Sequence, residues 1–290
     1  MRSFDYFAPQ KLGEAVSLLR RHGRKATLLA GGTDLLLRLE RRTVVPGLVV
    51  DLKKVRGLKG IKSDRKGIKI GALTLMEEIA SSPLIQKRYG TIAQGAAVVG
   101  SIQTRNRATI GGNLCNASPA ADTAPPLIAL AARVRIAGGQ RAREVQLEEF
   151  FLAPGKTSLK PNELLKEIFI PSPPRRSGGS FQRCTRTAMD IAVVNCAVFL
   201  SLAPKDDIVT DVRIALGAVA PTPLRARAAE EALRGKKADR QAIDEGVERA
   251  AASANPIDDV RSSADYRREM VRVLTRRALE GALRQVRGES

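Results

Sequence analysis

Two pairs of adjacent glycines, each followed by polar residues, are the strongest sign of chemistry in this sequence. The first pair lies in segment 30–34 (AGGTD), and the second lies in segment 109–113 (TIGGN). Glycine has no Cβ, so it adopts positive φ easily and leaves neighbouring backbone N–H groups accessible. Concave clusters of backbone N–H groups bind phosphate. Two such turns in one chain predict a diphosphate held from two sides, as in a dinucleotide.

A double glycine alone is a weak indication, because tight connections often contain one. The pairs at 138–139 and 178–179 are interpreted as such connections. The two turns singled out above differ from them, because side chains that form hydrogen bonds follow the glycines directly. Neither turn fits the G-x-G-x-x-G pattern of a Rossmann domain. Neither ends in the Gly-Lys-Ser/Thr of a P-loop. The sequence therefore favours a nucleotide site of another kind.

Predicted strands and helices must hold these turns in place. Residues 26–30 form a short apolar run that leads into the first turn, and Asp34 is expected to cap the helix after it, since Asp is favoured at helix N-caps. Thr74 and Glu77 have the spacing of a capping box. Residues 86–99 are rich in Ala and predict one helix. Further strands are expected at 48–52, 67–73, 133–137 and 163–170.

The segment 171–179 is rich in Pro and Gly and is the best candidate for a linker. Beyond it, three predicted strands precede three predicted helices, which is typical of an α+β domain. The strands are expected at 181–186, 192–202 and 209–219, and the helices at 226–233, 240–252 and 264–286. We therefore predict two domains, at residues 1–174 and 179–287.

Composition limits the partners of the chain. The 290 residues include 49 Lys and Arg against 30 Asp and Glu, a net charge of +19. The basic residues are dispersed and are not interleaved with aromatic side chains, as a base-stacking platform would require. We therefore interpret the positive charge as a solvated surface or as a face for an acidic partner subunit. Nucleic acid is not expected as a partner. The longest apolar stretch, 191–203, is too short to span a bilayer.

Cysteine and histidine are too few and too scattered to build a metal site. Cys115, Cys184 and Cys196 form no C-x-x-C pair and no disulfide framework. His22 is the single histidine, which excludes a histidine-based metal triad. We identify no catalytic side chain and no metal ligand. Because no apolar signal region begins the sequence, a cytoplasmic, reducing setting is expected.

The residues around both glycine turns resemble one flavin family. Segment 109–126 (TIGGNLCNASPAADTAPP) resembles the second flavin motif of the FAD-binding medium subunit of molybdenum hydroxylases, the xanthine dehydrogenase and carbon monoxide dehydrogenase family. Segment 30–35 (AGGTDL) resembles the first motif of that subunit. The resemblance continues in order along nearly the whole chain, at 4–9, 103–106, 189–192 and 215–225.

This resemblance implies a fold and a cofactor. The expected fold is α+β, with a PCMH (vanillyl-alcohol-oxidase-like) FAD-binding domain of two subdomains, roughly 1–57 and 58–174. A small α+β domain like that of CO dehydrogenase flavoproteins, with an antiparallel sheet and helices, is expected to follow at 179–287. FAD is expected to bind non-covalently, because some family members have His where this sequence has Thr33. Three scattered cysteines do not supply the four thiolates of the iron–sulfur insertion in the branch that resembles hydroxybenzoyl-CoA reductase.

The resemblance also implies which residues contact FAD. The diphosphate and ribityl chain are expected to be lined by Leu28, Leu29, Ala30, Gly31, Gly32, Thr33, Asp34 and Leu35. The opposing loop is expected to consist of Thr109, Gly111, Gly112, Asn113 and Asn116. Asp122 is expected toward the adenosine ribose or nearby backbone, and Leu165 or Ile168 on the adenine side. Arg183 is expected beside the flavin ring, where the family often has Lys.

Simpler interpretations of these residues remain open. For Asp34 and Asp122, the alternative role is that of a helix cap. Leu165 and Ile168 alternate along a predicted strand, so they have the alternative of core residues. For Arg183 the alternative is a surface charge.

The resemblance implies an electron-transfer subunit that is not active alone on substrate. It would take electrons from a [2Fe-2S] small subunit, in a complex with a molybdopterin-binding large subunit, and pass them to NAD+ or another soluble acceptor. Two alternatives stay open. One is a flavin-free scaffold subunit of the same kind of complex, and the other is a basic nucleic-acid-binding protein.

Overall fold

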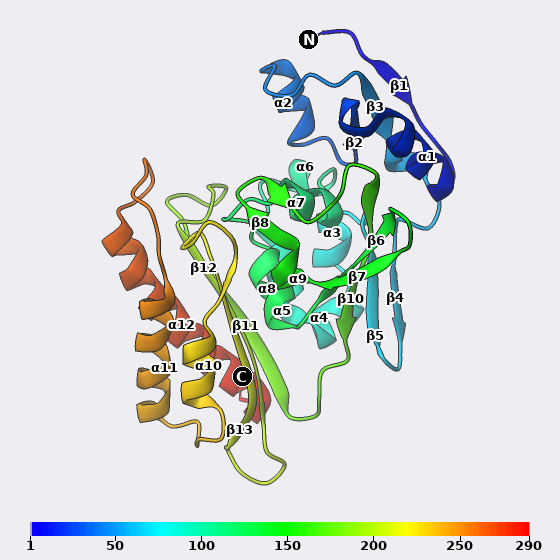
Figure 1. Ribbon diagram of the computed structural model, residues 1–290. Coiled ribbons are helices and arrows are strands. Elements are labelled where there is room, and N and C mark those ends of the chain that lie inside the picture. The colour runs from blue at the N-terminus through cyan, green and yellow to red at the C-terminus, as the bar shows by residue number, and fades with distance from the viewer. Residues whose placement is uncertain (1, 290) are drawn as a thin grey trace.

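The computed structural model describes residues 2–289 and is built around three main sheets (Figure 1). Within these residues the sheets contain three, five and four strands, and a two-stranded hairpin accompanies them. Helices and strands are mixed, and the sheet of the C-terminal part is antiparallel. The predicted α+β class is therefore confirmed. Across residues 2–289, no helix combines the length and the apolar character needed to cross a bilayer.

The first sheet is parallel and has the order β1-β3-β2. Its strands are β1 (Asp5–Phe7), β2 (Ala26–Leu29) and β3 (Leu48–Asp51), and its helices are α1 (Leu12–His22) and α2 (Leu35–Glu40). All four residues of β3 are buried, because β3 is the central strand and α1 packs against it. Strand β2 ends directly before the first glycine turn, so the edge of this sheet positions that turn.

The second sheet is antiparallel and has the order β4-β5-β10-β6-β7. Its strands are β4 (Ile61–Asp64), β5 (Gly67–Gly71), β6 (Arg133–Gly138), β7 (Arg143–Gln146) and β10 (Glu163–Pro171). The associated short helices are α3 (Met76–Ala80), α4 (Pro83–Arg88), α5 (Gly90–Ala97), α6 (Ile102–Arg105), α7 (Ile110–Asn116), α8 (Ala124–Ala129) and α9 (Leu147–Phe150). A hairpin of β8 (Phe151–Ala153) and β9 (Lys156–Thr157) lies beside them.

Two local predictions for this region are wrong. The single helix predicted for 86–99 is two helices, α4 and α5, which meet at Tyr89 with a non-helical ψ of 38°. The buried Tyr89 and the weak helix propensity of Gly90 account for the break. The predicted capping box at Thr74 is displaced by one residue, because the Glu78 carboxylate accepts the N–H of Leu75 at 3.0 Å. The Thr74 hydroxyl oxygen instead accepts the N–H of Gly60.

The third sheet has the order β11-β12-β13-β14 and is covered on one side by three helices (Figure 1). The strands are β11 (Ser177–Cys184), β12 (Val194–Leu202), β13 (Val209–Gly217) and β14 (Leu224–Arg225), and the helices are α10 (Arg227–Leu233), α11 (Arg240–Ser253) and α12 (Ala264–Arg287). All nine residues of β12 are buried, because successive side chains point to opposite faces. Val198 joins the core beneath α10–α12, whereas Ala197 and Phe199 join the core of the second sheet.

The glycines at 178–179 were predicted to form a tight connection. This prediction is wrong, because both glycines lie inside β11. A Cβ on Gly178 would approach the carbonyl oxygen of Ala282 to 2.6 Å. The glycine is therefore required by the close packing of α12 on this strand. In contrast, Gly138 and Gly139 both have positive φ and turn the chain at the end of β6, in agreement with the prediction.

Candidate functional site

The first glycine turn (residues 30–34) connects β2 to α2. Gly32 has φ of +82°, in the region that favours glycine. A Cβ on Gly31 would collide with the carbonyl oxygen of Arg107, which lies just before the second turn. Both glycines are therefore needed, one for backbone conformation and the other for close approach.

The amide groups of this turn are open. The backbone N–H groups of Gly31, Gly32, Thr33 and Asp34 have no hydrogen-bond acceptor within residues 2–289. They follow one another at the beginning of α2, where the helix dipole adds partial positive charge. Successive free N–H groups of this kind form an anion-binding concavity. The first turn thus has the donor set that a phosphate requires.

The second glycine turn (residues 109–113) differs, because its amides are already used. Gly111 donates to the carbonyl of Ala72 at 2.8 Å, and Gly112 donates to the Thr109 hydroxyl at 3.1 Å. The N–H groups of Ile110 and Asn113 also have backbone acceptors. The expectation that both turns expose their amides is therefore wrong for the second one. Its glycines permit packing instead, since a Cβ on Gly111 would lie 2.7 Å from Ala72.

The structure brings the two turns together. A Cβ on Gly112 would lie 3.9 Å from the Cβ of Ala30. The Asn116 amide donates to the Asp34 carboxylate at 3.3 Å, across 82 residues of sequence. Within residues 2–289 the Asp34 side chain accepts no hydrogen bond from the N–H groups of α2, so the interpretation of this side chain as a helix cap is wrong.

Asn113 lies in the middle of α7 and is held by a hydroxyl group. The Thr123 hydroxyl donates to the Asn113 side-chain oxygen at 2.6 Å. The Asn113 Nδ2 donates no hydrogen bond to any other part of the described chain. This side chain is therefore fixed through its oxygen and offers its nitrogen as a donor.

Asp122 and Arg183 form a buried ion pair, with 3.2 Å between Oδ1 and Nε. Asn195 of β12 also donates to the Asp122 carboxylate, at 2.9 Å. Burial raises the pKa of Asp122 to about 6, against the opposing effects of Arg183 and Asn195. Asp122 therefore does not cap α8, and Arg183 is not a surface charge.

This pairing brings together two residues for which the resemblance implies separate roles. Asp122 was expected toward the adenosine ribose or nearby backbone, and Arg183 beside the flavin ring. Their side chains touch, so the two residues lie at one place in the fold. The Arg183 guanidinium is also held by the carbonyl groups of Val98 and Asp190.

Leu165 and Ile168 lie on β10, at the centre of the second sheet. Their side chains are 4% and 0% exposed and belong to the hydrophobic core of that sheet. The core interpretation therefore accounts for both side chains. A cofactor contact at these positions would have to come from the backbone.

The remaining residues of the first motif lie around its turn. Leu28 and Leu29 end β2, and Leu35 begins α2. Each of these side chains is partly exposed, as are Ala30 and Thr33.

Sequence reasoning missed two residues of this region. Asn195 is fully buried, with its Nδ2 on Asp122. An Asn inside a mostly apolar strand was the signal that could have identified it. Ala218 donates its N–H to the carbonyl of Pro119 at 2.8 Å, which joins the C-terminal sheet to the second motif.

Comparison with known proteins identifies the family. A family model described as the FAD binding domain in molybdopterin dehydrogenase matches residues 2–173. A second, described as the CO dehydrogenase flavoprotein C-terminal domain, matches residues 179–282. These two matches cover most of the chain.

Individual relatives agree with the family models along their whole length. The medium chain of carbon monoxide dehydrogenase from Hydrogenophaga pseudoflava is 35% identical over 279 residues, which is 96% of this chain and 96% of that protein. A putative xanthine dehydrogenase FAD-binding subunit of Escherichia coli is 30% identical and covers 98% of each chain. A solved structure of the Hydrogenophaga pseudoflava carbon monoxide dehydrogenase superimposes with a TM-score of 0.93 at 36% identity, covering 97% of both chains.

The open amides of the first turn, the second motif beside it and these matches lead to one conclusion. The chain belongs to the family of FAD-binding medium subunits of molybdenum hydroxylases, which includes those of carbon monoxide dehydrogenase and xanthine dehydrogenase.

Proposed function

We propose that this chain is the electron-transfer subunit that carries FAD in a molybdenum hydroxylase complex. It receives electrons from a [2Fe-2S] small subunit and passes them to NAD+ or another soluble acceptor. A molybdopterin-binding large subunit oxidises the substrate, so this chain is not active alone. The observation that carries the proposal is the row of four free amides at residues 31–34, beside the second motif.

The residues of the two turns fit a dinucleotide diphosphate. The N–H groups of Gly31 to Asp34 would donate to its phosphate oxygens. Gly112, which faces Ala30, would leave the space that a side chain would fill. Asn113 and Asn116 would supply polar side chains from the opposite loop. Bound FAD, held here without a covalent bond, would accept single electrons and release them in pairs.

Arg183 and Asp122 would act together at one end of the cofactor. We assign them to the flavin end, because the Arg183 guanidinium would stabilise negative charge that develops as electrons arrive. Asp122 would hold that guanidinium in position. Leu165 and Ile168 would support the site as core residues of β10.

We further propose that residues 1–174 and 179–287 are separate domains, with subdomains at roughly 1–57 and 58–174. The succession of three sheets along the chain supports this division. The second motif and the C-terminal sheet meet at Asp122 and Asn195, so the FAD site would lie near the junction of the two domains.

The direct test is the flavin content of the purified complex that contains the full-length chain. We expect a flavin absorption spectrum and the release of one FAD per chain on denaturation. A colourless complex that takes up no added FAD would indicate a scaffold subunit. Affinity for nucleic acid that falls steeply with salt would support the other alternative.

A substitution at Gly112 tests the location of the site. Gly112→Val would place a branched side chain between the turns. Its Cβ alone would lie 2.9 Å from the Thr109 hydroxyl oxygen. We expect at least a tenfold loss of FAD affinity, measured by quenching of flavin fluorescence. Gly13→Val is the control, because a Cβ there meets nothing within 4 Å. Unchanged FAD content in folded Gly112→Val would contradict the proposed site.

A further inference from the structure

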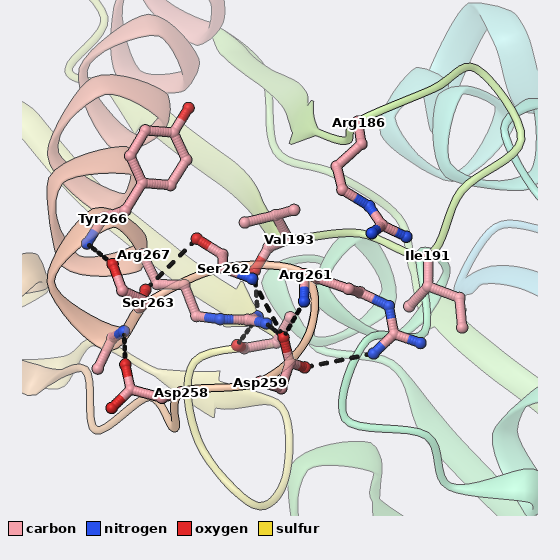
Figure 2. A network of polar contacts seen from close by, with 12 residues as sticks. Arg186, Ile191, Val193, Asp258, Asp259, Arg261, Ser262, Ser263, Tyr266 and Arg267 are labelled. Carbon is pink, nitrogen blue, oxygen red and sulfur yellow. Dashed lines mark hydrogen bonds and ion pairs between the residues drawn. The ribbon is translucent and has the colours of Figure 1, made fainter.

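Arg267 of α12 is a buried cation that lies far along the sequence from both glycine turns. Arg267 is only 3% exposed. Nη1 donates to the carbonyl of Val193 at 2.6 Å and to that of Ala218 at 3.1 Å. Nη2 donates to the Asp259 carboxylate at 2.7 Å (Figure 2). One guanidinium thus has three acceptors.

Each acceptor of Arg267 belongs to a different loop. Val193 ends the loop 185–193, between β11 and β12. Ala218 directly follows β13, and Asp259 lies in the loop 254–263 between α11 and α12. Figure 2 shows Arg267 among these segments, with Arg261 and Ser262 beside Asp259. A single side chain therefore joins three loops at one end of the C-terminal sheet.

Two of these loops are linked by polar contacts to the second FAD motif. Ala218 donates its own N–H to the carbonyl of Pro119 at 2.8 Å, so its peptide groups connect Arg267 with that motif. Ala218 has φ of +63°, a conformation that alanine adopts only where contacts hold it. These two contacts, one on each side of Ala218, are what hold it.

The loop 185–193 reaches the site by a second route. The carbonyl of Asp190 accepts a hydrogen bond from Arg183, and Arg183 pairs with Asp122. Asp190 is three residues from Val193, where Arg267 binds the same loop. The position of the Arg183 guanidinium therefore depends on a loop that Arg267 holds at its far end.

The chemistry of the site favours a role for Arg267 in positioning. Its Nε lacks a hydrogen-bond acceptor in the part of the chain that the structure describes. Burial of a cation with an unsatisfied donor has a free-energy cost that a hydrophobic side chain of similar volume would avoid. A planar guanidinium holds five donors in a fixed fork, which suits it to bind two carbonyl groups and a carboxylate together.

We propose that Arg267, together with Asp259, is a positioning residue for the flavin site. Arg267 holds the turn at Ala218 against Pro119, and it holds the loop 185–193 behind Arg183. Both contacts set the affinity of the chain for FAD and the charge around the flavin. This inference rests on the proposed site, in which Arg183 lies at the flavin end.

The test uses four variants of the full-length chain in its purified complex. Arg267→Met removes the donors and keeps the volume, and Arg267→Lys keeps the charge but replaces the planar fork of donors by an ammonium group. Asp259→Asn removes the charge of the acceptor, which Arg261 also contacts at 3.3 Å. The matched control is Arg272→Met, because Arg272 lies on the same helix and pairs with Glu248 at 3.0 Å, away from the three loops.

We expect Arg267→Met to weaken FAD binding at least tenfold and to change the flavin reduction potential. Arg267→Lys is expected to restore part of both properties. Asp259→Asn should weaken binding about threefold, and Arg272→Met should stay within twofold of wild type. A merely structural role of Arg267 would lower the melting temperature without moving the FAD affinity or the potential of the folded variants.

The outcomes separate this inference from the proposed function. FAD affinity and potential unchanged in folded Arg267→Met would overturn the inference alone. If that variant does not fold, Arg267→Lys and Asp259→Asn decide by the same two measurements, and wild-type values in both would overturn it. A wild-type complex that binds no FAD would overturn the proposed function and this inference together.

Discussion

At Arg183, one guanidinium joins three segments that are far apart in the sequence. Its nitrogens meet the Asp122 carboxylate and the carbonyl groups of Val98 and Asp190. A basic residue on an alternating strand gives no sign of such partners, which is why a surface charge remained an open interpretation. The side chain is only 10% exposed, so its positive charge acts in a medium that screens it poorly.

The neighbouring Asp122 predicts an unusual dependence of stability on pH. Its pKa in the folded chain is raised from 3.8 to about 6 by burial, so the folded state binds a proton more readily than the unfolded state. The contribution of this group to the free energy of unfolding therefore increases as the pH falls from 7 to 4, by up to about 3 kcal/mol.

Comparison of wild type with Asp122→Asn isolates this effect, because other titrating groups are common to both. We expect wild type to gain stability relative to the variant as the pH is lowered, as measured by chemical denaturation at each pH. A difference that is constant between pH 7 and pH 4 would contradict the raised pKa.

At the scale of elements, the first glycine turn precedes α2 and the second forms the N-terminal end of α7, and the two helix starts use their N–H groups differently. Helix α7 has acceptors for the N–H groups of Ile110 to Asn113 within the protein. At α2, the N–H groups of residues 31–34 have no acceptor in the part of the chain that the structure describes. Only the first turn can therefore donate backbone hydrogen bonds to an anion, and the second contributes shape and side chains.

Thr109 provides a test of this division. Thr109→Ala removes the cap on Gly112 and should lower the free energy of unfolding by about 1 kcal/mol. Because α7 carries Asn113 and Asn116, FAD affinity should fall as well, whereas Thr109→Ser should retain both properties. Thermal unfolding and FAD titration are the measurements.

Ser82 supplies the matched control for this prediction. Its hydroxyl caps α4 by accepting the N–H of Ile85 at 3.4 Å, remote from both turns. Ser82→Ala should lose stability and keep its FAD affinity. Equal loss of affinity in the two alanine variants would mean that the Thr109 effect is global.

In the whole molecule, the C-terminal sheet packs directly against the second FAD motif. Asn195 meets Asp122, Ala218 meets Pro119, and β12 and β13 both contact α8. Alternate residues of β12 belong to two hydrophobic cores, so this strand links the two parts of the chain. The C-terminal part therefore comes after the motif in the sequence and also packs against it in space.

Asn195→Val tests this link between the two parts. The substitution leaves the buried Asp122 carboxylate without the 2.9 Å hydrogen bond from Nδ2. We expect a loss of about 1–3 kcal/mol in the free energy of unfolding, together with weaker FAD binding. Ser201→Ala is the control, because Ser201 lies on the same strand and bonds Thr210 instead. Wild-type FAD affinity in folded Asn195→Val would argue against a link to the site.

The sequence by itself determined the class of fold, most strands and helices, and the family. These follow from features that are local in the chain: the alternation of apolar residues in 163–170, the helical spacing in 264–286, and the motif at 109–126. The local predictions failed where packing outweighed propensity, as at Tyr89, where one predicted helix became two.

Only the tertiary structure decided which polar groups are free and which are paired. The carbonyl of Ala72 accepts the N–H of Gly111, whereas that of Gly31 has no acceptor among residues 2–289, yet the two glycine pairs look alike in the sequence. Asp122 meets both Arg183 and Asn195 across more than 60 residues of chain, as Asp34 does Asn116. A hydrogen bond depends on distance and direction in space, and for these residues both are set by the packing of separate sheets.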